Sequence, residues 1–259
     1  HPKRAGAGAK QQPQGENADG DDEPAAPTAS AASLIFTDAA DDGSVVYKAE
    51  VKGGCLRELR RQVQVTHGFH IDVQYDFKSD AVTPQVPGFR LRDTTKLRAY
   101  QEASLERFLR GGAARNGVVV LPCGAGKTLT GVAAAAAVGR PVIVMCINEL
   151  SVRQWREQFM KWATLSRKQV SVFTGKNKEW PADVFISTYN MMTTEAVRLP
   201  DGTYSESQAW KARILAEVER RPWGLMLLDE VHGAPAADFQ RVLDRVRYHC
   251  VLGLTATLL

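Results

Sequence analysis

Short apolar runs alternate with stretches of helical periodicity from about Leu91 onward. Each run is brief, does not alternate regularly with polar residues and is rich in Val, Ile or Leu, as expected of strands buried on both faces. The runs are Gly117–Leu121, Val142–Ile147, Val170–Phe173, Val184–Thr188, Leu225–Leu228 and Val251–Leu254. The helical stretches are Lys127–Val138, Glu149–Trp162, Glu206–Arg220 and Ala236–Tyr248. This alternation predicts an α/β fold with a mostly parallel, doubly wound sheet.

A smaller unit is predicted over residues 34–90. Ser44–Val51 and Phe69–Phe77 alternate between apolar and polar residues, as strands do, and Cys55–Thr66 between them has helical spacing. A strand–helix–strand unit of this size has too small a core to be stable alone. We therefore expect an α+β accessory unit that packs on the larger lobe over residues 91–259.

Residues 1–33 form a third region, which is predicted to be a disordered tail. The region is rich in Ala, Gly, Pro and Gln, and its basic residues precede an acidic patch at residues 16–23. It has almost no large apolar side chains to bury, so nothing opposes the entropy of the chain. A solvated linker is a simpler interpretation of this composition than a binding tail.

The bulk composition sets few limits on function. Apolar residues make up 44% and charged residues 24% of the chain, and the net charge of +4 permits nucleic-acid binding without arguing for it. The four cysteines are too far apart for a zinc site or a redox pair, so buried thiols in a reducing compartment are expected. The most apolar stretch, Leu129–Ile147, is interrupted by Gly, Arg and Pro, so no membrane span is predicted. Because the chain begins with His1, we expect a fragment or a processed chain.

A phosphate-binding loop is predicted between the strand that ends near Val120 and the helix that begins at Lys127. The segment reads Leu121-Pro122-Cys123-Gly124-Ala125-Gly126-Lys127-Thr128. Glycines let backbone N–H groups turn inward around the phosphates of ATP, and the N-terminus of the following helix attracts them. The Lys supplies a charge for the β- and γ-phosphates, and the Thr hydroxyl is a ligand for Mg²⁺. Leu121 stands where the usual pattern has Gly or Ala, but the Gly-x-Gly-Lys-Thr end is intact.

An acidic pair follows the apolar run Leu225–Leu228. Parallel sheets place their ligands at the carboxyl ends of the strands. Asp229 is suited to hold Mg²⁺ there, and Glu230 is suited to orient and deprotonate the attacking water. A solvated acidic turn is the alternative for this segment alone, but together with Lys127 the pair predicts ATP hydrolysis. Two residues further on, His232 is expected to sense the γ-phosphate.

Further segments surround these motifs in a fixed order. They are Leu97-Arg98-Ala99-Tyr100-Gln101, Ser151-Val152-Arg153-Gln154-Trp155, Ile186-Ser187-Thr188-Tyr189 and Gly253-Leu254-Thr255-Ala256-Thr257. The whole set resembles superfamily 2 helicases over about residues 91–259. The resemblance implies a RecA-like P-loop lobe in which Gln101 contacts adenine. It also implies that Thr255, Ala256 and Thr257 couple the ATP site to the nucleic-acid track.

Several strings resemble one family more closely, the XPB family of DNA-translocating ATPases in TFIIH. They are Leu-Pro-Cys-Gly-Ala-Gly-Lys, Trp-Gly-Leu-Met-Leu-Leu-Asp-Glu-Val-His and Leu-Gly-Leu-Thr-Ala-Thr-Leu. Tyr75-Asp76-Phe77 is similar to that family's pre-helicase region, which implies a damage-recognition-like unit at 34–90. The resemblance implies an ATP-dependent translocase or helicase of three-prime to five-prime polarity, with ATP and Mg²⁺ as cofactors. It further implies double-stranded DNA and other TFIIH subunits as partners, and a role in transcription initiation and nucleotide excision repair in the nucleus.

The chain departs from that family near its end. An Arg-Glu-Asp segment is expected soon after Thr257 but is not reached before Leu259, and the second ATPase lobe with its arginines is absent. Such an arginine contributes on the order of 10³–10⁵ in rate in related NTPases. We therefore expect the chain alone to bind nucleotide weakly and to hydrolyse it very slowly.

Candidate DNA contacts lie in three segments: Asn148–Arg153, Thr174–Lys178 and Thr188–Asn190. In motors of this type the DNA backbone is expected across the sheet edge opposite the ATP-facing side. Arg153 and Lys176 would add salt-dependent affinity, and the Thr188 hydroxyl would hold a phosphate without reading sequence. Ordinary solvated surface explains each of these cations equally well.

Three alternatives to a DNA translocase stay open. A regulatory ATP-binding module without effective hydrolysis would share the phosphate loop, but the intact Lys127 and Glu230 favour hydrolysis. A P-loop small-molecule kinase would not need the Asp-Glu-Val-His and Thr-Ala-Thr segments. A restriction-type or RNA-dependent superfamily 2 motor fits the catalytic motifs and fits the flanking strings less well.

Overall fold

The computed structural model describes residues 32–257 except 40–44, 52–55, 69–72 and 234. The chain divides into two compact units, His1–Ile71 and Asp72–Leu259. The expected tail therefore lies outside the described residues, apart from its last two positions.

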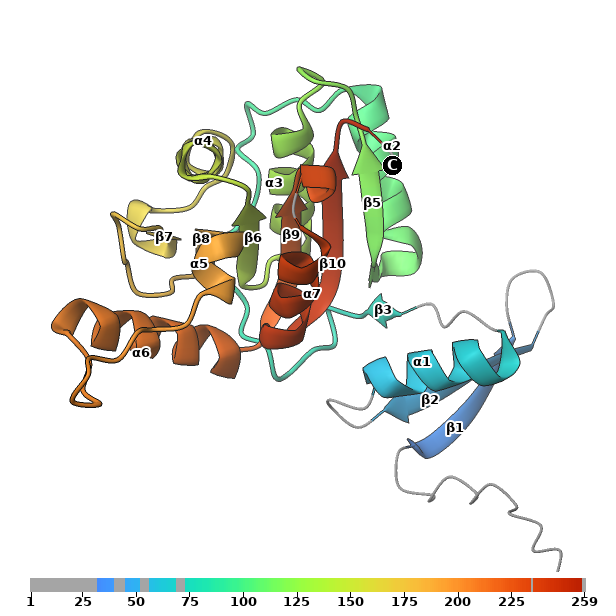
Figure 1. The fold of residues 1–259 in the computed structure, drawn as a ribbon. Coiled ribbons are helices and arrows are strands. Elements are labelled where there is room, and N and C mark those ends of the chain that lie inside the picture. Colours follow the sequence, from blue (N-terminus) through green and yellow to red (C-terminus); the bar gives the residue numbers. More distant parts are fainter. Residues whose placement is uncertain (1–31, 40–44, 52–55, 69–72, 234, 258–259) are drawn as a thin grey trace, which may run out of the picture. The chain divides into compact units, whose positions relative to one another are not determined.

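The described residues of the first unit form a two-stranded antiparallel sheet and one helix (Figure 1). Strand β2 (Val45–Val51) and helix α1 (Leu56–His67) lie within one residue of their predicted bounds. Strand β1 (Ala32–Ala39) was not predicted, and it begins inside the segment expected to be tail. Its pairing with β2 explains the difference, because a partner strand supplies hydrogen bonds that local composition does not reveal.

The second unit contains a parallel six-stranded sheet in the order β5-β10-β9-β6-β8-β7. All six predicted strands are present, which confirms the α/β fold class. They are β5 (Gly117–Val120), β6 (Val142–Cys146), β7 (Val170–Phe173), β8 (Val184–Thr188), β9 (Trp223–Asp229) and β10 (Tyr248–Thr255).

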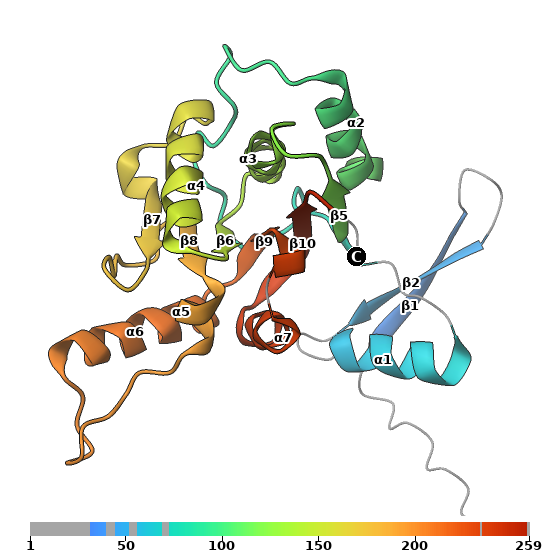
Figure 2. The same ribbon diagram turned by 45° about the horizontal axis from the view of Figure 1, so that its top comes forward.

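Helices cover both faces of this sheet (Figures 1 and 2). One face carries α2 (Ala99–Phe108), α3 (Lys127–Val138) and α4 (Glu149–Trp162). The other face carries α5 (Tyr189–Thr193), α6 (Glu206–Arg220) and α7 (Ala236–Arg245). Alternate residues of one strand enter the two cores, as Val144 and Met145 of β6 do. This explains why the strands lack a regular apolar–polar alternation: both faces are buried.

Three of the four predicted helices, α3, α4 and α6, have the predicted bounds. The fourth prediction, Ala236–Tyr248, is wrong at its end, because α7 stops at Arg245. Val246 has an extended backbone, and Tyr248 begins β10 by pairing with Trp223. The amphipathic pattern continues past Arg245, but pairing with the neighbouring strand decides the conformation there.

The boundary expected at residue 90 lies instead between Ile71 and Asp72. Only Gln74–Tyr75 (β3) of the predicted strand Phe69–Phe77 is a described strand, and it pairs with β4 (Ala114–Arg115) of the lobe. Tyr75 also stacks on His249, with ring centroids 4.5 Å apart and an interplanar angle of 8°. These contacts make the segment after residue 72 part of the lobe.

Cys146 and Cys250 are buried thiols on β6 and β10, as predicted, whereas Cys123 is exposed in the phosphate loop. Cys55 lies outside the described residues. Among the helices that the structure describes, none is long and apolar enough to span a bilayer.

Candidate nucleotide-binding site

The predicted phosphate loop connects the end of β5 to the first turn of α3. Gly124 and Gly126 have φ values of 78° and 82°, which side chains disfavour. A Cβ at Gly126 would lie 2.6 Å from Nε2 of Gln101, so the Gln101 side chain would have to shift to admit one. The loop therefore leaves its backbone open toward the N-terminus of α3, as an anion cradle requires.

Helix α2 holds this loop from one side. The buried Gln101 donates from Nε2 to the carbonyls of Ala125 and Gly126, both at 3.2 Å, and its Oε1 accepts from the Arg98 N–H at 2.9 Å. The Tyr100 hydroxyl donates to the Ala125 carbonyl at 2.8 Å. The Gln101 amide is thus engaged with the loop, and its contact with adenine stays a prediction. The contact of Tyr100 was missed, although the residue lies in the same sequence motif.

The structure brings Lys127 and Glu230 together. Lys127 Nζ lies 2.9 Å from Glu230 Oε1, and the side chains are 11% and 29% exposed. Glu230 directly follows β9 and has φ 48°, the only positive value for a non-glycine residue in the described chain. Such a conformation costs a non-glycine residue roughly 1–2 kcal/mol and is often found at functional sites. It turns the backbone sharply at the carboxyl end of the strand.

Asp229 is the last residue of β9 and is mostly buried beside this pair. Burial raises the pKa of its carboxyl group, while the indole N–H of Trp155 and the Lys127 ammonium act in the opposite direction. Thr128, the other predicted Mg²⁺ ligand, is half-buried in the first turn of α3. His232 lies in the short 3₁₀ helix Val231–Gly233, and its side chain is outside the described part of the chain.

The Thr-Ala-Thr segment joins the site through the backbone. Thr255 pairs with Val120 in the sheet, and its carbonyl accepts from the Leu121 N–H at 3.0 Å. The Thr255 hydroxyl donates to the Thr257 carbonyl at 2.9 Å, which forms a tight turn around Ala256. A shift of this turn would therefore act directly on the start of the phosphate loop.

The predicted DNA segments lie on the same edge of the sheet as the phosphate loop. They follow the carboxyl ends of β6, β7 and β8, and the nucleotide motifs follow β5, β9 and β10. Because all six strands are parallel, these segments share an edge with the phosphate loop, and the path of DNA across the sheet stays a prediction. The nucleotide motifs follow three neighbouring strands, β5, β10 and β9, and the predicted DNA segments follow the other three, β6, β8 and β7. The two sets therefore occupy separate halves of the carboxyl edge of the sheet.

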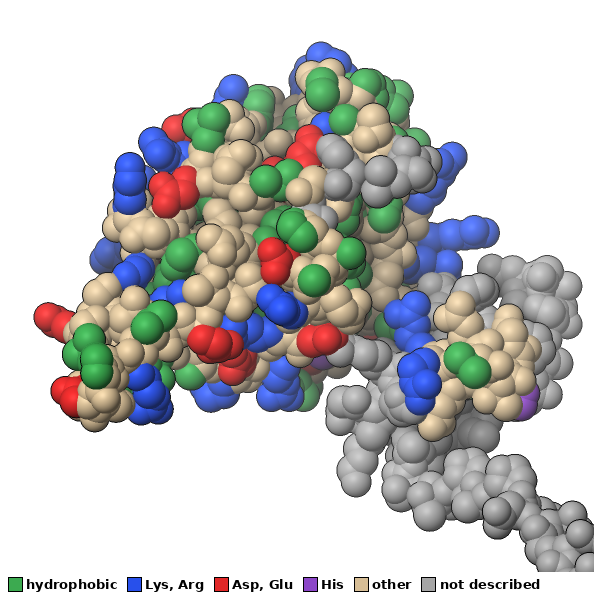
Figure 3. All heavy atoms as spheres, in the orientation of Figure 1, with side chains coloured by type: hydrophobic (Ala, Val, Ile, Leu, Met, Phe, Trp, Pro, Cys, Tyr) green, Lys and Arg blue, Asp and Glu red, His purple; other side chains and the backbone are tan. Residues whose placement is uncertain are grey.

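The individual DNA candidates differ in accessibility. Arg153 and Lys176 are exposed, but the Thr188 side chain is buried, and its hydroxyl accepts from the Met191 N–H to cap α5. Lys178 donates to the Ser207 hydroxyl on α6. On the face in Figure 3, basic and acidic side chains of the described residues are interspersed rather than gathered into one patch. The contacts of Arg153, Lys176 and Thr188 with DNA stay predictions.

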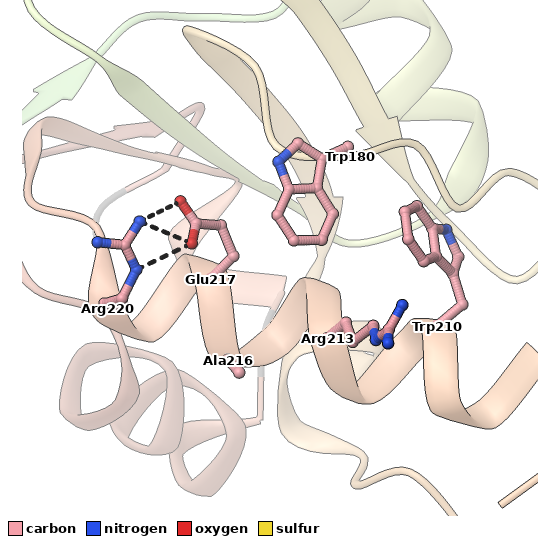
Figure 4. A pocket seen from close by; sticks show the side chains of 6 residues that line it. All are labelled: Trp180, Trp210, Arg213, Ala216, Glu217 and Arg220. Carbon is pink, nitrogen blue, oxygen red and sulfur yellow. Dashed lines mark hydrogen bonds and ion pairs between the residues drawn. The ribbon is translucent and has the colours of Figure 1, made fainter.

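A distinct groove lies outside the nucleotide site, next to the predicted DNA segment Thr174–Lys178. Its volume is about 530 Å³, and it is formed by one face of α6 and the connection after β7 (Figure 4). The lining side chains are Trp180, Trp210, Arg213, Ala216, Glu217 and Arg220. No motif of the sequence pointed to it.

Comparison with known proteins agrees with this geometry. A family model described as "Type III restriction enzyme, res subunit" matches residues 94–259, which contain both the phosphate loop and the acidic pair. In solved structures, the UvsW helicase from bacteriophage T4 aligns with a TM-score of 0.51 and 13% identity, over 84% of this chain and 76% of that chain. A likeness at this identity shows the fold alone, which is the RecA-like helicase fold.

Several proteins with known roles are more similar to this chain in sequence than the UvsW helicase is. The TFIIH helicase/translocase XPB subunit of Trypanosoma brucei brucei is 47% identical over 215 residues, which are 83% of this chain and 23% of that protein. The XPB subunit of Dictyostelium discoideum is 44% identical over 189 residues, or 72% of this chain and 22% of that protein. The XPB subunit of Saccharomyces cerevisiae is 38% identical over 221 residues, which are 84% of this chain and 25% of that protein. The chain thus spans about a quarter of the length of these relatives.

The family match covers most of the chain, and the relatives share its motifs in a parallel α/β lobe. The chain therefore belongs to the superfamily 2 helicase family that this model describes, and it is a homologue of the XPB helicase/translocase subunits of TFIIH.

Proposed function

We propose that this chain is the ATP-binding lobe of a DNA translocase that acts within TFIIH in transcription initiation and nucleotide excision repair, in the nucleus. The observation that carries the proposal is the pairing of Lys127 with Glu230 across the carboxyl edge of the sheet. A phosphate-loop lysine and a candidate general base are thereby placed at one point, where parallel α/β sheets bind their ligands.

The residues present fit ATP and Mg²⁺. The positive φ of Gly124 and Gly126 opens the loop, and the free N–H groups of the first turn of α3 face it. Mg²⁺ prefers hard oxygen ligands, so the Thr128 hydroxyl and the Asp229 carboxylate would hold it together with phosphate oxygens. When bound, the metal neutralises charge on the phosphates. Lys127 would turn from Glu230 to the β- and γ-phosphates.

Glu230 is then free to orient the attacking water and to accept its proton. Cations from a second lobe would stabilise the transition state, so the chain alone is expected to turn over slowly. The segments after β6, β7 and β8 would hold the DNA backbone on the other half of the same edge. We expect the turn after Thr255 to couple the ATP site to DNA, because the Thr255 carbonyl accepts from the first N–H of the phosphate loop.

ATP hydrolysis by a chain extended through the second lobe tests this proposal. We expect turnover that double-stranded DNA stimulates and that Lys127→Ala abolishes. Nucleotide binding without turnover would favour the regulatory module instead. Stimulation by RNA but not by DNA would leave the roles of Lys127 and Glu230 standing and contradict the role in TFIIH.

A further inference from the structure

The groove on α6 contains two exposed tryptophans. Trp180 is 47% and Trp210 38% exposed, and their ring centroids lie 5.4 Å apart at an interplanar angle of 38° (Figure 4). The two rings form one contiguous aromatic surface, and Trp and Arg are among the residues most enriched at interface hot spots. Neither indole takes part in the nucleotide site.

The groove is built on anchored backbone. Trp210 Nε1 donates to the Lys178 carbonyl at 2.7 Å, which fixes its ring to the connection after β7. On the other side of Trp180, Arg221 donates to the carbonyls of Pro181 and Ala182, at 3.3 and 2.9 Å. A groove held in this way loses little conformational entropy when a ligand binds.

The polar groups of the groove define its ligand. Among the described residues, none accepts a hydrogen bond from the Trp180 indole N–H, and none forms an ion pair with the exposed Arg213. Glu217 is already held by two hydrogen bonds from Arg220 Nη2 and one from Nε, at 2.9 to 3.0 Å. The groove therefore offers an apolar aromatic surface, one free N–H donor and one cation without a counter-charge.

We propose that this groove binds a proline-containing acidic segment of a partner protein in the polyproline II conformation. Such a segment makes no internal hydrogen bonds, so its carbonyls are free to accept from the Trp180 N–H. Its proline rings pack against tilted aromatic side chains, as in other proline-recognition grooves. An acidic side chain beside the prolines pairs with Arg213. This inference does not depend on ATP hydrolysis.

A single-stranded nucleic acid fits the groove less well. Base stacking on tryptophan would suit the two rings, but a nucleic-acid groove needs a track of cations for successive phosphates. Here a carboxylate, Glu217, lines the groove beside its cations. The charge pattern therefore favours a peptide with isolated carboxylates.

Titration of the 259-residue chain with a synthetic peptide of consecutive prolines flanked by glutamates tests the proposal. Calorimetry and tryptophan fluorescence would measure binding. We expect saturable binding that weakens roughly tenfold or more in Trp180→Ala and in Arg213→Glu. Arg167→Glu is the matched control, because it makes the same charge change at an exposed position that does not line the groove. Circular dichroism would show that each variant is folded.

Three outcomes would overturn the proposal. The first is the absence of saturable binding, and the second is equal binding of a peptide in which glycine replaces every proline. The third is binding of a thymidine oligonucleotide that depends on Trp180 and Arg213 while the peptide does not bind. Equal loss of binding in Arg167→Glu and Arg213→Glu would likewise contradict a specific ion pair.

Discussion

Lys127 Nζ and Glu230 Oε1 lie 2.9 Å apart, so the cation of the phosphate loop is paired with the candidate general base. An incoming phosphate must therefore replace a carboxylate that is already in place. The pair also holds the loop and the end of β9 together before any ligand binds. The first of these consequences can be measured with one substitution.

Glu230→Gln should separate nucleotide binding from hydrolysis. Loss of the carboxylate releases Lys127 for the phosphates, so ATP binding should be kept or become tighter. Removal of the general base should lower DNA-stimulated turnover on the order of 10²–10⁴-fold. Equilibrium binding of a fluorescent ATP analogue and steady-state hydrolysis measure the two effects, with Glu157→Gln on the exposed side of α4 as the control. Weaker binding together with normal turnover would contradict the assigned roles.

Gly126→Ala should abolish nucleotide binding. The substitution combines a left-handed backbone, which costs about 1–2 kcal/mol for a residue with a Cβ, with a close approach to Gln101 Nε2. Gly139→Ala is the matched control, because φ there is 63° and the nearest atom to the new Cβ is 3.9 Å away. Both variants should lose stability in urea unfolding, Gly126→Ala the more of the two, and only Gly126→Ala should lose ATP binding. Normal ATP binding by Gly126→Ala would show that the loop does not cradle the phosphates.

Gly131→Ala should destabilise the lobe, and Trp155→Phe should relieve part of the loss. A Cβ at Gly131 would lie 2.6 Å from the Trp155 ring and 2.9 Å from Leu254 Cδ1, and overpacking of this kind costs about 1–3 kcal/mol. Phe lacks the clashing part of the indole, so the double variant should lose less stability than the sum of the two single losses. Chemical denaturation measures this. Trp162→Phe, also on α4, is the control. Additive losses of stability in Gly131→Ala/Trp155→Phe would contradict a close contact between Gly131 and the Trp155 ring.

The segment after residue 72 should become less stable toward acid. Burial raises the pKa of Asp80, but hydrogen bonds from Tyr75, Thr83 and backbone N–H groups outweigh it and hold the pKa well below its usual range. The stabilisation from the ionised carboxylate is therefore present above the usual pKa of Asp, about 4, and is lost as the pH falls further. Burial also lowers the pKa of His249, whose contribution is lost in the same direction as the pH falls below about 6.5.

Asp80→Asn tests the acid sensitivity of this segment. Unfolding measured in urea from neutral pH to about pH 3 should show a smaller acid loss for the variant than for the parent chain. Asp201→Asn is the control, because Asp201 lies in an exposed turn where solvent screens its interactions. An equal acid loss in the parent chain and Asp80→Asn would exclude the proposed role of Asp80.

Local signals made part of the fold predictable from sequence. Helices α4 and α6 start at Asn148 and Ser205, whose side chains accept from the backbone N–H three residues later, and α3 ends at Gly139. These caps lie within a few residues of the ends that they define. The starts of α4 and α6 and the end of α3 therefore have local signals in the sequence.

Features that depend on distant partners were not predictable in the same way. Strand β1, the pairing of Gln74–Tyr75 with the lobe and the early end of α7 all depend on segments elsewhere in the chain. For the candidate site, the sequence motifs and their order were enough to predict Lys127, Asp229 and Glu230 as site residues. The hydrogen bonds of Gln101 and Tyr100 to the loop depend on where α2 packs, and the shared edge of the two sets of motifs depends on strand order. Periodicity encodes neither of these.

Strand β10 lies between β5 and β9, although it is the last of the described strands in the chain. The phosphate loop and the acidic pair therefore become neighbours only when this late segment is inserted between two strands made earlier. Contacts between residues so far apart in sequence form slowly. During synthesis on the ribosome, the nucleotide pocket would therefore be among the last parts of this lobe to form. ATP would bind, and so stabilise, only those chains in which β10 has already paired with β5 and β9.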